Sequence, residues 1–250
     1  ERNNYDYTTL MLAAKNGHIE TVKYLVMEHG DKVNLADRNN HGTTALMLAA
    51  SSGHTETVKY LSMEHGDKVN LADRNNYDFT ILMLTAYNGR TETVKYLLTE
   101  HGEKVNLADK NIDGDTTLML AAHCGHIETV IFLLTEYGDK VNLTDRNNYG
   151  NTALMIAAGA GHTETVKYLL TEHGDKVNLA DRDNYGNTAL MLAVNNGHTN
   201  TIKYLLTEHG DKVNLADKNN DGHTTLMLAA YNGHTDTMKY LLTEHGEKVN

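Results

Sequence analysis

Fifteen histidines are the side chains of this chain best suited to bind a metal or transfer protons. Twelve of them fall into two sets whose members are spaced by multiples of 36 residues: His18, His54, His126, His162, His198 and His234 in the first, and His29, His65, His101, His173, His209 and His245 in the second. A zinc site needs three or four ligands that converge on one point, whereas helices packed side by side keep like residues roughly 8 to 10 Å apart. We therefore predict no metal site. We expect the first set to satisfy free backbone groups at a helix start, and the second to carry a charge that suits a helix end.

Cys124 is the single cysteine and the candidate thiolate nucleophile, since His123 precedes it in the sequence. Such a nucleophile needs a base and a third group that orients the base, and the sequence identifies no third group. It also contains no glycine-rich phosphate-binding loop and no fixed pair of carboxylates. We therefore predict that the protein is not an enzyme and uses no cofactor.

The charge and the apolar runs argue against two classes of partner. The net charge of -11 comes from acidic residues spread along the chain, and it would repel the phosphates of a nucleic acid. The longest apolar runs, such as Leu46 to Ala50, fall far short of the roughly 20 residues needed to cross a bilayer. A lone cysteine favours a reducing compartment. We expect a cytoplasmic protein, or one in a host cytosol if it is a secreted effector, bound to neither nucleic acid nor membrane.

A 36-residue unit positions these side chains and recurs along the whole chain. The pentad V-N-L-A-D begins at Val33, Val69, Val105, Val177 and Val213, and Val141 opens V-N-L-T-D. A period of this length is typical of a stacked array, in which each unit buries its apolar face against its neighbours. We predict a single array of about seven units over residues 1–250. Because Glu1 falls within a unit and Val249–Asn250 opens an eighth, we expect an excerpt of a longer chain.

Each unit is predicted to begin with a finger. Val33 to Leu35 alternates apolar and polar residues as an extended segment does, and the turn formers Asn39 to Gly42 follow. This order predicts a hairpin-like loop. Gly42 suits a positive φ, and Asp6 and Asp78 at the matching places are among the better substitutes for glycine there.

Two short helices are predicted to follow the finger. Thr44 is expected to cap a helix from Ala45 to about Ser52, which Gly53 ends, and a second helix is expected from about Thr55 to His65. Both are shorter than the roughly 12 to 15 residues at which isolated helices become marginal in water. Their stability must therefore be shared along the array.

The motifs of the unit resemble the ankyrin repeat over essentially the whole chain. Thr44 to Ala50 reads T-A-L-M-L-A-A, Gly53–His54 opens the second helix, and Val58 to Leu61 reads V-K-Y-L. The resemblance implies an all-α fold, an ankyrin-repeat solenoid of helix-turn-helix units joined by hairpin-like fingers, which holds another protein on a concave surface of fingers and first helices. The unit is longer than the family's usual 33 residues, and its T-P-L-H tetrad has lost both proline and histidine. Two of the three additional residues are placed in the finger, so we expect fingers that reach further than usual.

The positions that vary between units are the predicted partner-binding residues. They gather at the finger tips and at the end of the first helix: Tyr5, Tyr7, His41, Tyr77, Phe79, Tyr87, Ile112, Asp113, Asp115, His123, Tyr149, Tyr185, Asp221, His223 and Tyr231. Aromatic side chains are preferred interface anchors because they bury much area at little rotamer cost. Units one and three carry an aromatic group and unit four an acidic one, which predicts a protein or peptide partner with apolar and basic groups.

Two alternatives stay open. Each finger-tip tyrosine could fold over its own loop and serve only local packing. The array could also be structural, with copies that stack end to end through uncapped terminal repeats, because such ends fit one another in a contact that does not close.

Overall fold

The computed structural model describes residues 1–30 and 32–248, so the expected eighth unit at Val249–Asn250 lies outside the described residues. The described residues form pairs of short α-helices, with two isolated β-bridges and no strand. The helices are α1 Thr9–Lys15, α2 Ile19–Glu28, α3 Ala45–Ser52, α4 Thr55–Glu64, α5 Ile81–Tyr87, α6 Thr91–His101, α7 Thr117–His123, α8 Ile127–Tyr137, α9 Ala153–Gly159, α10 Thr163–Glu172, α11 Ala189–Asn195, α12 Thr199–Glu208, α13 Thr225–Tyr231 and α14 Thr235–His245, followed by the 3-10 helix η1 Gly246–Lys248. The expected all-α class is confirmed.

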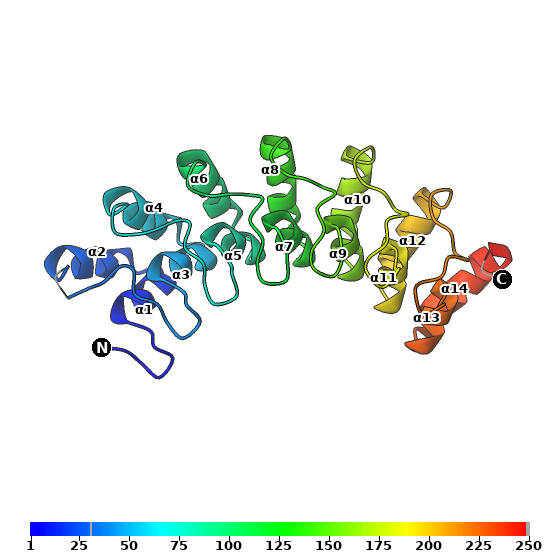
Figure 1. Cartoon of the computed structure of the whole chain (residues 1–250), viewed down its shortest axis with the longest axis horizontal. Helices are drawn as coiled ribbons and strands as arrows, with labels where there is room; N and C mark the ends of the chain where they lie inside the picture. Colours follow the sequence, from blue (N-terminus) through cyan, green and yellow to red (C-terminus); the bar gives the residue numbers. More distant parts are fainter. Residues whose placement is uncertain (31, 249–250) are drawn as a thin grey trace. The chain divides into compact units, whose positions relative to one another are not determined.

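The chain divides into two compact units, and each is described by itself. The first comprises Glu1–Ala121 and Phe132–Val141, and the second comprises Ala122–Ile131 and the described residues from Asn142 onward. In the first unit α1, α3 and α5 pack side by side, and α2, α4 and α6 form a second layer (Figure 1). In the second unit α9, α11 and α13 form the first layer and α10, α12 and α14 the other. The prediction of a single array over residues 1–250 stays a prediction.

The first helix of each pair begins at a threonine, as expected. Thr44 Oγ1 accepts a hydrogen bond from the Met47 backbone N–H at 3.3 Å, which satisfies one of the free donors of the first turn of α3. Leu46, Ala49 and Ala50 are buried on one face of α3. The small alanines allow α1 and α5 to approach α3 closely, and these are the helices that α3 contacts in its own layer.

A glycine follows the first helix for two reasons, and Gly161 shows both. Its φ is +78°, which favours glycine. A Cβ at Gly161 would also lie 2.4 Å from the His198 ring of the next repeat. His198 Nε2 donates to the Gly159 carbonyl oxygen at 2.9 Å, so the imidazole closes the end of the preceding first helix.

The first histidine set repeats this contact. His54, His162 and His234 reach the carbonyl oxygens of Lys15, His123 and Asn195 at 3.0, 2.8 and 2.9 Å. The expectation that these side chains satisfy free groups at the start of their own helix is wrong, because the N-cap histidines of α2, α4, α10, α12 and α14 make no side-chain cap hydrogen bond. The imidazoles instead satisfy carbonyl groups at the end of a first helix. The groups belong to the preceding repeat, so each such histidine joins two repeats.

The pentad forms a turn, and the expectation of an extended Val33–Leu35 segment is wrong. The Asp37 N–H donates to the Asn34 carbonyl oxygen at 3.1 Å, and the Ala36 N–H donates to Asn34 Oδ1 at 3.0 Å. Asparagine side chains compete for backbone N–H groups in this way and so favour turns over strands. Extended pairing in the described residues is confined to the bridges Arg2↔Thr8 and Arg74↔Thr80 at the base of two fingers.

The finger itself is the predicted tight loop. Asn39 Oδ1 accepts from the His41 and Thr43 N–H groups at 3.0 and 2.9 Å, and the Asn39 N–H donates to the Thr43 carbonyl oxygen at 3.1 Å. Gly42 has a φ of +74°, and the matching Asp6 and Asp78 have +65° and +59°. The prediction of positive φ at these three positions is confirmed.

Replacing Gly161 with alanine tests the joint between repeats. A left-handed backbone costs an alanine about 1–2 kcal/mol, and displacing the His198 ring removes a hydrogen bond worth about 1 kcal/mol. We expect the free energy of unfolding, measured by urea denaturation, to fall by about 2–3 kcal/mol on adding these terms.

The matched control is the same change in a His198→Ala background, where the ring is absent. There we expect Gly161→Ala to cost only the backbone part, about 1–2 kcal/mol. An equal cost in both backgrounds would show that the imidazole does not require this glycine.

Candidate functional site

Backbone hydrogen bonds join the tips of successive fingers. The Asn76 N–H donates to the His41 carbonyl oxygen at 2.9 Å, and the Ile112 N–H donates to the Tyr77 carbonyl oxygen at 3.2 Å. In the second unit Asn184 and Asn220 donate in the same way to Tyr149 and Tyr185, both at 2.9 Å. The side chains of Asn76, Asn184 and Asn220 add a bond from Nδ2 to a carbonyl oxygen of the preceding finger, each at 3.0 Å. The residues that accept the main-chain bonds contribute only their carbonyl groups to them, so the side chains of His41, Tyr77, Tyr149 and Tyr185 are free to differ between repeats.

Arginine side chains hold the bases of the fingers together, a role that was not expected from the sequence. Arg74 Nη1 donates to the carbonyl oxygens of Asp78, in its own finger, and Lys110, in the next, at 3.1 and 2.8 Å. Its Nη2 lies 2.9 Å from Asp109 Oδ1. Arg2, Arg38, Arg146 and Arg182 make the same three contacts. The sequence signal that could have identified these arginines is an Arg directly after the Asp of the pentad, repeated at multiples of 36 residues.

The residues predicted to bind a partner, which we call the finger surface, all have accessible side chains. The exposed members are Tyr5, His41, Tyr77, Tyr87, Ile112, Asp113, His123, Tyr149, Tyr185, Asp221 and Tyr231. The half-buried members are Tyr7, Phe79, Asp115 and His223. Among its tyrosines Tyr231 is the most exposed, with 80 % of its surface accessible.

Ring contacts bring members of the finger surface together. Phe79 and Tyr87, from the finger and first helix of one repeat, pack edge to face with centroids 6.0 Å apart. His41 stacks at 6.3 Å on Tyr77 of the following repeat. Tyr77 therefore connects two fingers of the first unit.

Two further pairs follow the within-repeat pattern. His223 stacks on Tyr231 at 6.0 Å, and Lys15 Nζ lies 5.3 Å from the centre of the Tyr7 ring. Each pair joins a finger to the first helix behind it. The variable columns of one repeat thus lie side by side, although they are distant in the sequence of the unit.

The acidic residues of the fourth repeat, Asp113 and Asp115, lie on the finger that follows the finger of Tyr77. Asn111 Oδ1 accepts from the backbone N–H groups of Asp113 and Asp115 at 3.0 and 2.8 Å, which shapes that finger. The neighbouring Ile112 is 58 % exposed. His123, the remaining predicted residue of this repeat, belongs to the other compact unit.

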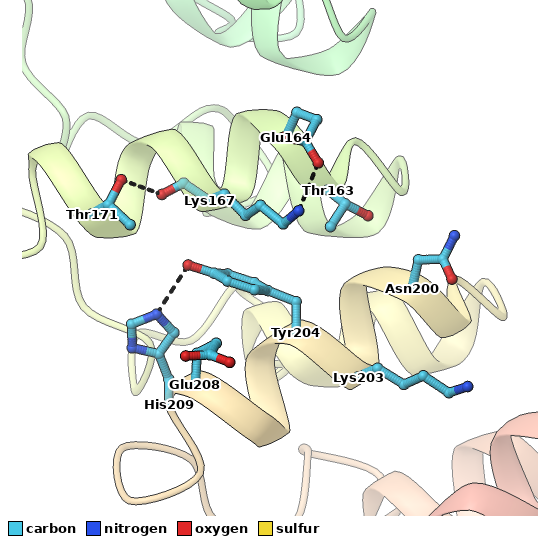
Figure 2. Close-up of a pocket in the computed structure, with 9 residues that line it drawn as sticks. All are labelled: Thr163, Glu164, Lys167, Thr171, Asn200, Lys203, Tyr204, Glu208 and His209. Carbon is cyan, nitrogen blue, oxygen red and sulfur yellow. Dashed lines mark hydrogen bonds and ion pairs between the residues drawn. The ribbon is translucent and has the colours of Figure 1, made fainter.

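A groove also lies between the second helices of consecutive repeats. Figure 2 shows the groove between α10 and α12, about 670 Å³, with Tyr204 lying between Lys167 and His209. Lys167 Nζ is 2.7 Å from Glu164 Oε1 and 5.8 Å from the centre of the Tyr204 ring. The groove between α4 and α6 has the same construction. Because its residues recur from repeat to repeat, we assign this groove to stacking.

A family model for ankyrin repeats in three copies matches residues 1–73, 69–145, 138–217 and 177–250. The chain belongs to the ankyrin repeat family. The crystal structure of the human ASB11 ankyrin repeat domain is similar, with 23 % identity, 96 % of this chain and 99 % of that chain covered, and a TM-score of 0.77. No curated protein sequence matches the chain. The expected ankyrin-repeat solenoid is therefore confirmed, and ankyrin repeats generally act as protein–protein interaction modules.

The second histidine set of these ankyrin repeats does not serve as a helix-end cation at His101. Burial lowers the pKa of this imidazole, and the charge of Lys104 lowers it further. Its Nε2 lies 3.0 Å from the Tyr96 hydroxyl, and the two rings are nearly perpendicular. His29, His65 and His209 pair with Tyr24, Tyr60 and Tyr204 in the same way. At His101 the expected cation is disfavoured because the ring is partly buried.

Other chemistry finds little support in this ankyrin chain. The described residues include no group of three His, Cys, Asp or Glu side chains that could hold a metal ion. Burial raises the pKa of the Cys124 thiol, which disfavours a thiolate. No helix among residues 1–30 and 32–248 is long and apolar enough to cross a membrane.

The lowered pKa of His101 predicts a pH-dependent stability. The unfolded imidazole has the ordinary pKa near 6.5 and binds more protons than the folded one in the window just below that value. We expect the melting temperature to fall between about pH 7.5 and 5.5, and His101→Gln to remove part of that fall.

Lys104→Ala is the graded control, because it removes only the second cause of the shift. Its pH dependence should lie between those of the wild type and His101→Gln. Identical pH slopes for the wild type and His101→Gln would contradict this role of His101.

Proposed function

We propose that this ankyrin array is a protein-binding module that holds a protein or peptide on its finger surface. The proposal rests on one observation, that the main chain and the side chains have separate roles at the finger tips. The main-chain carbonyl groups of Tyr77 and the equivalent residues make the stacking contacts, while their side chains vary and stay exposed. Exposed aromatic rings that the stack does not need are suited to anchor a partner.

The chemistry of the first unit indicates what the partner presents. Tyr77, Phe79 and Tyr87 offer an apolar aromatic surface, and the adjoining finger adds Ile112 with Asp113 and Asp115. A complementary segment has apolar side chains flanked by Lys or Arg. The net charge of -11 would steer such a basic segment toward the array.

We further propose that the protein works in the cytoplasm, or in a host cytosol, and has no catalytic role. The support for the compartment is the single cysteine, since disulfides are rare where thiols are kept reduced. The support for a binding role is the family, whose members generally act as interaction scaffolds.

Selection of displayed short peptides against the array tests the assigned surface. The wild type should enrich peptides that combine aromatic or aliphatic residues with Lys or Arg. The triple variant Tyr77→Ala, Phe79→Ala and Tyr87→Ala should bind those peptides at least tenfold more weakly while circular dichroism shows unchanged helicity, because these side chains lie outside the buried core.

The control variant changes three apolar residues on the second helices, Tyr24, Met27 and Met63, to alanine. Their exposed fractions are 58 %, 71 % and 65 %, comparable with those of the finger surface. This control should bind as the wild type does. Equal binding by the Tyr77, Phe79 and Tyr87 variant would refute the assigned surface.

End-to-end assembly is a second candidate, favoured by apolar side chains exposed on the first and last described repeats. Leu12 is 41 % exposed, whereas the equivalent Leu48 is 6 % exposed. Met227 is 50 % exposed, whereas the equivalent Met191 is 1 % exposed. A second copy that stacks head to tail would bury these side chains as the interior repeats do, in a contact that does not close.

Light scattering as a function of protein concentration tests this second candidate. The mass should rise with concentration, and Leu12→Glu or Met227→Glu should hold the protein at the mass of one chain, because a buried unpaired charge opposes stacking. A wild type that stays at the mass of one chain at high concentration would count against assembly.

A further inference from the structure

Ser62 is the irregular member of an otherwise aliphatic column in the second helices. The other members are Val26, Leu98, Leu134, Leu170, Leu206 and Leu242. Ser62 is 4 % exposed, so its hydroxyl lies where the neighbouring repeats bury a branched aliphatic side chain. The replacement forgoes apolar burial and requires hydrogen bonds for the hydroxyl.

Those hydrogen bonds form a closed cluster with the next repeat. Ser62 Oγ lies 2.9 Å from the Tyr96 hydroxyl and 3.2 Å from His101 Nε2, and the last two atoms are 3.0 Å apart. A longer contact of 3.4 Å joins Ser62 Oγ to the Lys59 carbonyl oxygen. In a repeat with leucine at this position, Tyr204 and His209 keep their own bond at 3.2 Å. The tyrosine–histidine pair therefore does not need the serine.

With the imidazole proton of His101 on Nδ1, the cluster leaves hydrogen-bonding capacity on the serine. A neutral imidazole that accepts at Nε2 brings no proton to the cluster, and Ser62 and Tyr96 each bring one. Ser62 Oγ has two lone pairs, and the single Tyr96 proton occupies at most one of them. At least one lone pair of Ser62 is then open to a further donor.

A hollow that Ser62 helps to line is bounded by the segments that follow α4 and α6. Its volume is about 380 Å³, within the range of about 300–1,000 Å³ for small-molecule sites. Its lining includes Ser62, the apolar Val69, Leu71 and Ala72, and the exposed Glu103 and Lys104.

The second unit contains a smaller hollow that overlaps the corresponding place and extends toward Thr188 and Asp217. It is lined by Leu179, Ala180, Asp211 and Lys212, the equivalents of Leu71, Ala72, Glu103 and Lys104, and its volume is about 150 Å³. Leu170, the equivalent of Ser62, is not part of its lining. The change from leucine to serine thus accompanies a larger hollow that reaches the second helix.

We propose that the hollow at Ser62 binds a small uncharged molecule with an apolar body and a hydroxyl or amide N–H group. The donor group bonds to Ser62 Oγ, and the body contacts Val69, Leu71 and Ala72. Glu103 and Lys104 carry opposite charges, so they give an ionic ligand no net preference. In a regular array, a polar residue in a column of buried aliphatic residues is expected at a functional site when it brings no gain in stability. The hollow contains no residue of the finger surface, so this inference does not rest on the proposed function.

Titration with benzyl alcohol, followed by methyl NMR of Val69, Leu71 and Ala72, tests this site. In the wild type the shifts should move and saturate, whereas toluene, which lacks the donor, should bind at least tenfold more weakly. Ser62→Ala keeps the hollow without the hydroxyl, so it should bind both probes equally weakly. Ser62→Leu should abolish binding and raise the melting temperature, because leucine at this position packs well in the other repeats.

Leu170→Ser is the matched gain-of-binding variant. It places a hydroxyl beside Tyr204 and His209, and benzyl alcohol should then shift the methyl groups of Leu179 and Ala180. Shifts in the wild type that do not saturate, or that persist in Ser62→Leu, would overturn the proposal. Equal affinity of benzyl alcohol for the wild type and Ser62→Ala would overturn the role of the hydroxyl.

Discussion

Stacking of each repeat on the next is the constraint on which the rest of this structure depends. The first helices have seven or eight residues and the second helices ten or eleven, fewer than isolated helices need in water. Their leucine and alanine faces pack against the other helix of the same repeat and against the neighbouring repeats. The histidine contacts to the preceding first helix and the arginine contacts between fingers add polar joints to the same interface. No repeat of this kind is complete without its neighbour.

This constraint also explains where variation is tolerated. At the finger tips the stacking contacts run through main-chain N–H and carbonyl groups, which every residue except proline supplies. Side chains there can change from His41 to Tyr77 without loss of the joint. The second helices lack this freedom, since their Lys, Glu and Tyr side chains pack across the groove between repeats. A binding surface therefore develops on the fingers at little cost to the fold.

Polar side chains within the stack also depend on the neighbouring repeat for their hydrogen bonds. His101 contacts the hydroxyl groups of Tyr96 in its own helix and of Ser62 in the preceding repeat. Burial lowers the pKa of its imidazole and so favours the neutral form. The adjacent hollow exists where one leucine of the column is replaced. Small departures from the repeat thus have local physical consequences, because the surrounding copies hold the backbone in place.

The sequence by itself determined the local elements, since the caps at Thr44, the positive φ at Gly42 and Asp78 and the helix bounds depend on residues within a few positions of one another. The motifs of the unit carried the family resemblance, and comparison of the repeats within the chain identified the variable columns. Only the tertiary structure decided which group each polar side chain meets. His198 bonds a carbonyl 39 residues earlier and Arg74 one 36 residues later, distances in sequence that no local pattern resolves. The lowered pKa of His101 and the hollow at Ser62 likewise arise from contacts and packing that form only when the chain is folded.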